Sequence, residues 1–182
     1  MTGGIQEFKD SFPEYAKDTR INFGTVLSHE GSPGLTESQI AGIALASAYA
    51  AKSSVVVKVV RESSAGVLME QEVNAARAAA SIMAMNNVYY RFVHLLEDKE
   101  YQSMPAKLRM TVIGNPGISK ADFELYALAV SAVNGCGMCM DSHARQLVKA
   151  GLTKEAVQSA VRIAAVINSA AQALWITERE AA

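Results

Sequence analysis

The fold is decided by residues 36–52, TESQIAGIALASAYAAK. Thr36 and Gln39 have the spacing of a capping box, which marks the first turn of a helix. Apolar and small side chains then recur at helical spacing up to Lys52, and alanine predominates among them. The stretch therefore predicts a buried, alanine-rich helix.

Most of the remaining sequence also favours helices, so we predict an all-α fold. The run from Val55 to Val60 is rich in the β-branched residues typical of strands. An isolated strand would have no partner, and we therefore expect a helix there. The other helices expected in this part of the chain are residues 13–23 with Gly24 at the end, residues 67–97 with a break at Asn86 and Asn87, and residues 105–113.

A firm turn at residues 115–117, NPG, opposes helix continuation and separates the last part of the chain. Two further breakers, Gly135 and Gly151, divide that part into helical segments. The expected helices are residues 119–133, a helix whose first turn holds Cys136 and Cys139, and a last helix capped by Thr153 that runs through Trp175.

An internal comparison suggests that one helical unit occurs twice. When the sequence is shifted by 84 positions, apolar residues of 68–82 fall on apolar residues of 152–166. The duplicated units would be about residues 36–84 and 119–168, within a single all-helical domain spanning residues 1–182. At the same shift, one unit has no cysteine where the other has both. Cys136, Cys139 and His143 fall opposite Lys52, Val55 and Val59.

Composition and charge exclude several classes of function. The 182 residues suffice for one buried core, and a net charge of −1 gives no footprint for nucleic acid or an anionic membrane. No apolar run approaches the ~18 residues that span a bilayer, and residues 1–10 do not resemble a secretory signal. We therefore expect a cytoplasmic protein, in a reducing compartment where a lone cysteine pair is more often catalytic or metal-binding than structural.

Both cysteines lie in residues 136–143, CGMCMDSH. Thiols at this spacing can close a disulfide, and His143 lies one helical turn after Cys139, where it can take the proton of that thiol. Cys136 is better placed for the helix N-terminus, so these residues leave the order of attack open. Glu124 is the candidate carboxylate to orient His143, because an unpaired carboxylate in its apolar surroundings would be costly.

Other interpretations of the cysteine motif remain. Two buried thiols can be inert, and Cys136, Cys139, His143 and Glu124 together could bind zinc. Structural zinc is more typical of small, loop-rich modules, so we expect no metal. A thioredoxin-type site is excluded because the surrounding βαβ pattern is absent. Met138 and Met140 are expected to line an apolar mouth beside the cysteines.

Several segments outside the motif resemble the alkyl hydroperoxidase D (AhpD) family, which is part of the carboxymuconolactone decarboxylase superfamily. They are residues 12–18 (FPEYAKD), 83–91 (MAMNNVYYR), 115–118 (NPGI), 123–125 (FEL) and 131–136 (SAVNGC). The resemblance implies an all-helical, duplicated fold that assembles as a homotrimer. It also implies a lipoyl-dependent peroxidase without a tightly bound cofactor. Its reductant would be dihydrolipoamide on an acyltransferase of a 2-oxo acid dehydrogenase complex.

The resemblance also assigns roles. The thiols would reduce organic peroxides or pass electrons to the peroxiredoxin alkyl hydroperoxide reductase C. Cys139 matches the cysteine that becomes a sulfenic acid, and Cys136 matches its proton donor and disulfide partner. Glu124 and His143 match the proton relay. Met138 departs from the family pattern, which has a histidine between the cysteines, so altered thiol reactivity is expected.

Two other classes of function remain as alternatives. One is a decarboxylase or related carbon-acid enzyme of the same superfamily, which would need no disulfide cycle. The other is a non-enzymatic redox or zinc-binding adaptor.

Overall fold

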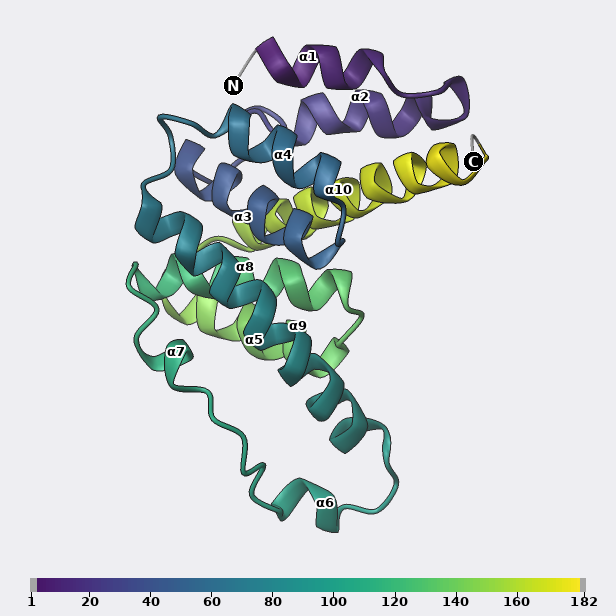
Figure 1. The fold of residues 1–182 in the computed structure, drawn as a ribbon. Coiled ribbons are helices and arrows are strands. Elements are labelled where there is room, and N and C mark those ends of the chain that lie inside the picture. The colour runs from purple at the N-terminus through teal and green to yellow at the C-terminus, as the bar shows by residue number, and fades with distance from the viewer. Residues whose placement is uncertain (1–2, 181–182) are drawn as a thin grey trace.

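Helices dominate the structure because caps and apolar repeats follow one another closely along the chain. The computed structural model describes residues 3–180, and no strand occurs among them (Figure 1). The helices are α1 (Gly3–Asp10), the 3-10 helix η1 (Glu14–Ala16), α2 (Lys17–Val26), α3 (Glu37–Ala50), α4 (Ser54–Ser63), α5 (Glu70–Leu95), α6 (Glu100–Ser103), α7 (Thr111–Gly114), α8 (Lys120–Val133), α9 (Gly137–Lys149) and α10 (Lys154–Glu180).

Three predicted helix starts carry side-chain caps, and those at Thr36 and Thr153 were expected. The backbone N–H of Gln39 donates to Oγ1 of Thr36 at 3.2 Å, and the Thr36 N–H donates to the Gln39 side chain at 2.9 Å. Ser119 accepts the N–H of Asp122 at 3.1 Å. Thr153 accepts an N–H in the first turn of α10, also at 3.1 Å. The starts of α3, α8 and α10 are therefore confirmed.

The centre of the molecule is the packing of α3 against α8. Residues 40–48 of α3 and 123–131 of α8 are buried without exception. Both helices also pack against α5 and α10. Close approach depends on Gly42, because a Cβ at that position would lie 2.0 Å from the phenol oxygen of Tyr126. The stretch that predicted a buried helix thus lies in the middle of the core.

The same three-helix arrangement occurs twice, in α3–α4–α5 and in α8–α9–α10. In each case the third helix packs on the first two helices of the other unit, so α5 contacts α8 and α9 while α10 contacts α3 and α4. The N-caps Thr36 and Ser119 lie 83 positions apart, as do the N-caps Ser53 and Cys136. The buried blocks of α3 and α8 have this same spacing.

This register corrects the predicted alignment at the cysteines. The third helices begin at Glu70 and Lys154, which are 84 positions apart, so the C-terminal unit has one more residue before its third helix. A shift chosen to align the third helices therefore misplaces the second helices by one residue. The counterparts of Cys136, Cys139 and His143 are Ser53, Val56 and Val60 rather than Lys52, Val55 and Val59.

The helix predicted between Pro13 and Phe23 differs from the structure. A single 3-10 turn follows Pro13, α2 begins only after it, and Gly24 lies inside α2 instead of ending it. A glycine within a helix costs about 1 kcal/mol. Burial of Phe23 and Val26 on one face of α2 offsets that cost.

The break predicted at Asn86 and Asn87 is also wrong. Helix α5 continues through both residues to Leu95, and both side chains are buried. The valine run at residues 55–60 is helical, as predicted. Helix α10 continues five residues beyond the predicted end at Trp175, to Glu180.

The short helix predicted over residues 105–113 is wrong except at its end, where α7 begins. Residues 105–110 have no regular secondary structure, and their side chains alternate between exposed and half-buried. Lys107 has a φ of 53°, in the left-handed region that interrupts a right-handed helix. The segment is therefore an extended loop that leads to α7.

The two units differ in what covers them. Helix α1 packs against α4 and α2, at the top of Figure 1. The ring of Phe8 lies 5.0 Å from the rings of both Phe12 and Phe23, between centroids. In the part of the chain that the structure describes, α9 has no such covering helix. At the opposite end, α5 projects and leads into α6, forming an arm (Figure 1).

Helix α10 has the length and composition of a membrane span, with a mean hydropathy of 1.3 over its most apolar 18 residues. It packs along α2, α3 and α8, and its alanine-rich face is buried there. These contacts are those of a core helix.

Candidate active site

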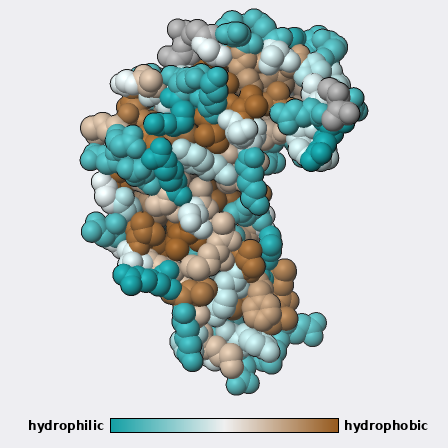
Figure 2. Space-filling model, in the orientation of Figure 1, coloured by the Kyte–Doolittle hydropathy of each residue, from teal (hydrophilic) through white to brown (hydrophobic). Residues whose placement is uncertain are grey.

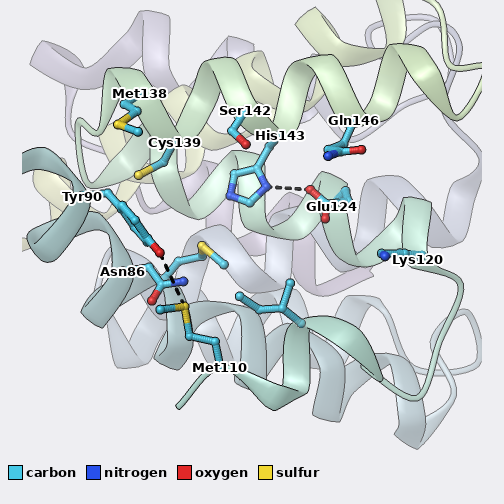
Figure 3. Close-up of a pocket in the computed structure, with 12 residues that line it drawn as sticks. Asn86, Tyr90, Met110, Lys120, Glu124, Met138, Cys139, Ser142, His143 and Gln146 are labelled. Carbon is cyan, nitrogen blue, oxygen red and sulfur yellow. Dashed lines mark hydrogen bonds and ion pairs between the residues drawn. The ribbon is translucent and has the colours of Figure 1, made fainter. Parts of the chain in front are cut away.

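A largely apolar cavity of about 460 Å³ lies between α5, α8, α9 and the segment around α7. Figure 3 shows side chains of α9 along one side, with Asn86, Tyr90 and Met110 across from them. The cavity is lined by Met83, Asn86, Tyr90, Met110, Ile113, Lys120, Glu124, Met138, Cys139, Ser142, His143 and Gln146.

The two cysteines are joined in a disulfide at the start of α9, with an S–S distance of 2.07 Å. Cys136 is the N-cap of the helix and is fully buried. Cys139, in the first turn, is 7% exposed and lines the cavity. The helix N-terminus stabilises negative charge on a thiolate in this position. When the pair is reduced, Cys139 is therefore the thiol that a ligand in the cavity can reach.

His143 and Glu124 form a close pair beside the disulfide. Nδ1 of His143 lies 2.6 Å from Oε2 of Glu124, and both side chains are largely buried. A hydrogen on Nδ1 can be donated to this carboxylate, which leaves Nε2 as the ring nitrogen available to the thiol. In Figure 3 the second ring nitrogen faces the Cys139 side of the ring. This arrangement suits an imidazole that exchanges a proton with the thiol.

A buried polar network holds the junction between α8 and α9. Gly135 adopts a φ of 69°, and the backbone N–H of Cys136 donates to the carbonyl of Ser131 at 3.0 Å. Nδ2 of Asn87 donates to Oγ of Ser131, and Nδ2 of Asn134 donates to Oδ1 of Asn87, each at 2.9 Å. The network fixes the turn that presents the disulfide, and Asn87 supplies its centre.

Comparisons with known proteins show which family the chain belongs to. The carboxymuconolactone decarboxylase family matches residues 99–178. A Coxiella burnetii protein named "Alkyl hydroperoxide reductase AhpD" is 54% identical over 168 residues, which are 92% of this chain and 95% of that protein. A Brucella canis protein of the same name is 50% identical over 176 residues, or 97% and 99% of the two chains. The chain belongs to the AhpD family.

Membership of the AhpD family confirms the resemblance drawn from the sequence segments. The structure brings all four predicted site residues together, Glu124 from α8 and the other three from the start of α9. Met138 lines the cavity as expected, whereas Met140 packs against the core instead. Among residues 3–180, no group of three or more His, Cys, Asp or Glu side chains is arranged to hold a metal ion.

Sequence reasoning missed the opposite wall of the cavity. That wall is formed by α5 and the segment around α7, and it includes Asn86, Tyr90 and Met110. In the sequence, residues 83–91 stand out only as a segment that resembles the AhpD family, within a helix predicted to break at Asn86 and Asn87. The order of apolar and polar side chains in residues 83–91 does not identify the distant segments that α5 faces.

Proposed function

We propose that this AhpD-family protein is a thiol peroxidase that reduces organic hydroperoxides by cycling Cys136 and Cys139 between dithiol and disulfide. The observation that carries the proposal is the position of Cys139, which faces an apolar cavity beside the His143–Glu124 pair and is bonded to a fully buried Cys136. The names of the relatives, which refer to alkyl hydroperoxide reduction, support the same class of reaction.

The oxidative half of the cycle begins with the reduced pair. His143, oriented by Glu124, takes the proton of Cys139, and the thiolate attacks the terminal peroxide oxygen. An S–O bond forms, the O–O bond breaks, and the alkoxide leaves as an alcohol after taking a proton. The Cys136 thiol then attacks the resulting sulfenic acid, so that the disulfide forms and water leaves. One hydroperoxide has been reduced and one dithiol oxidised.

The reductive half uses a dithiol of the dihydrolipoamide type. One of its thiolates attacks the disulfide, and its second thiol resolves the mixed disulfide, which restores both cysteines and leaves oxidised lipoamide. We propose a lipoyl-bearing acyltransferase of a 2-oxo acid dehydrogenase complex as the donor in a reducing cytoplasm. The peroxiredoxin alkyl hydroperoxide reductase C is a second proposed acceptor of electrons from the dithiol.

A homotrimer is part of the proposal, and the surface of the arm supports self-association. Large apolar side chains are exposed along the end of α5 and around α6, and Figure 2 shows hydrophobic surface in this lower part of the molecule. They are Val88, Phe92, Leu95, Tyr101 and Met104. Exposed apolar patches of this kind commonly mark protein interfaces. Light scattering with size-exclusion chromatography tests the assembly, and a monomer at micromolar concentration would contradict it.

Mass measurement of the intact protein tests the proposed chemistry. The reduced chain should lose two hydrogens after one equivalent of an organic hydroperoxide and regain them with dihydrolipoamide, with one alcohol formed per disulfide. A reduced chain that forms no Cys136–Cys139 bond under peroxide would instead favour a decarboxylase-type enzyme. One zinc per chain by metal analysis would favour an adaptor.

A further inference from the structure

The cavity contains a polar side chain that the proposed proton relay does not use, the carboxamide of Asn86. It comes from α5 and is 5% exposed. Its Oδ1 is the one fully buried side-chain N or O atom without a hydrogen-bond partner among residues 3–180. A buried acceptor without a partner lowers the stability of the fold.

The neighbouring residue shows what a structural asparagine looks like in the same helix. Asn87 is 1% exposed, its Nδ2 donates to Ser131, and its Oδ1 accepts from Asn134. Asn87 therefore contributes to holding α5 against α8. Asn86 makes no such contact and lines the cavity that Cys139 also lines. Of these two adjacent residues, Asn87 therefore hydrogen-bonds to the rest of the fold, whereas Asn86 does not.

The surroundings of Asn86 restrict what could pair with it. Met83, Met110 and Ile113 line the same cavity, and the Tyr90 hydroxyl is directed at the Met110 sulfur, 4.0 Å away. Figure 3 shows Asn86 beside Tyr90 and Met110, on the wall across from α9. A ligand that fits these walls has an apolar body, and its polar group is the part that Asn86 can bind.

We propose that Asn86 binds the peroxide group of an organic hydroperoxide and holds it for attack by Cys139, an inference that rests on the proposed peroxidase function. A carboxamide presents a donor and an acceptor side by side. The Oδ1 end is enclosed by the protein, so a hydroperoxide in the cavity meets the Nδ2 end, whose N–H can donate to a peroxide oxygen and stabilise the charge that develops there as the O–O bond breaks.

The test separates the two half-reactions in Asn86→Leu, which keeps the approximate volume and removes both hydrogen-bonding groups. Reduced protein is mixed with excess cumene hydroperoxide, and the rate constant for disulfide formation is measured by acid quench and mass analysis. The oxidised protein is then mixed with dihydrolipoamide, and disulfide reduction is followed in the same way. We expect the first rate constant to fall about 10- to 100-fold, the range for lost hydrogen bonds to a group that develops charge. The second should stay within about twofold.

Thermal unfolding separates a ligand-binding role from a structural one. Asn86→Leu should leave Tm unchanged or raise it, because it removes an unpaired buried acceptor. The matched variant Asn87→Leu should lower Tm, since Ser131 and Asn134 would lose their partner. If Asn86→Leu does not fold, Asn86→Ala provides the same kinetic comparison.

Each other outcome counts against the proposal in a distinct way. A slower reduction step with an unchanged peroxide step would assign Asn86 to the lipoyl ligand instead. Rate constants equal to those of the wild type in both steps would show that Asn86 has no role in binding either ligand. A wild-type protein that does not react with cumene hydroperoxide would overturn the proposed function together with the role of Asn86, whereas failure of the variant alone to differ would overturn only the latter.

Discussion

The two helical units of this protein share a backbone arrangement and differ in chemistry. In the C-terminal unit Glu124, Cys139 and His143 lie beside an open cavity. Their counterparts in the N-terminal unit, at the spacing set by the helix caps, are Ala41, Val56 and Val60. All three are buried, and the two valines belong to the hydrophobic core.

The cover of each unit matches its chemistry. Helix α1 packs over α4, where the exposed surface would otherwise be apolar valine. A carboxylate or an imidazole alone in that position would lose solvent without a partner, which is costly. In the C-terminal unit the two groups pair with each other, and the cavity keeps the thiol accessible. The comparison indicates that, of two units with similar helix order and contacts, the one whose second helix is left uncovered can hold a reactive site.

The largest expected effect comes from Cys139→Ser, which removes the sulfur that attacks the peroxide. Turnover of an organic hydroperoxide with dihydrolipoamide should be abolished, as measured by alcohol formation. The matched change in the other unit is Val56→Ala, which should keep turnover while lowering the free energy of unfolding by about 2 kcal/mol. Turnover near the wild-type level in Cys139→Ser would show that the chemistry does not depend on this thiol of the C-terminal unit.

The proton pair should give the next largest effect. His143→Gln is expected to slow disulfide formation by roughly 10²- to 10⁴-fold, the general range for a positioned acid–base group, and Glu124→Gln should slow it less. Rapid mixing of reduced protein with hydroperoxide measures both rates. Val60→Ala, at the counterpart of His143, is the control and should change stability but not this rate. Rates near wild type in both site variants would remove the relay from the mechanism.

A smaller effect, on stability alone, is expected where α3 meets α8. Gly42→Ala would place a methyl group 2.0 Å from the Tyr126 oxygen, while the counterpart of Gly42 in α8 is the full-sized Leu125. Overpacking of this kind lowers the free energy of unfolding by about 1–3 kcal/mol. Urea unfolding checks the change, with Gly4→Ala as the control because nothing lies within 4 Å of its added Cβ. Equal stability of the two variants would show that the packing there is looser than the structure indicates.

The smallest effect concerns pH. Burial, with the nearby charges of Glu72 and Asp122, raises the pKa of Tyr126 above its ordinary value. The folded state therefore favours the neutral phenol, and its contribution to stability is complete below pH ~10 and declines as the pH rises further. Ile43, its counterpart in α3, does not titrate. Unfolding measured between pH 8 and 11 should show a shallower alkaline decline in Tyr126→Phe, and identical profiles would contradict the assignment.

Local sequence signals predicted much of the fold. The capping box at Thr36 and the cap at Thr153 correctly located helix starts, because the bonds they make lie within four residues. The predictions over residues 105–113 and at Asn86 and Asn87 are wrong for the opposite reason. Those segments take their conformation from distant helices, which propensity does not describe.

The candidate site was predicted in part for similar reasons. Cys139 lies one helical turn from both Cys136 and His143, so their spacing alone places the three residues close together. Glu124 was expected to be paired because an isolated buried carboxylate is unstable, and it does meet His143 at 2.6 Å. Nothing in residues 83–91 indicated that one asparagine faces the cavity while the next bonds to α8.

The sequence by itself determined the helical class, most helix starts and the presence of a dithiol with an imidazole one turn away, since these depend on neighbouring residues. The tertiary structure decided which thiol faces the cavity and which is buried behind it. It also decided the 83-residue register of the two units and the unpaired state of the Asn86 carboxamide. These features depend on how helices far apart in the chain pack, and the free energy of that packing is not contained in any local stretch.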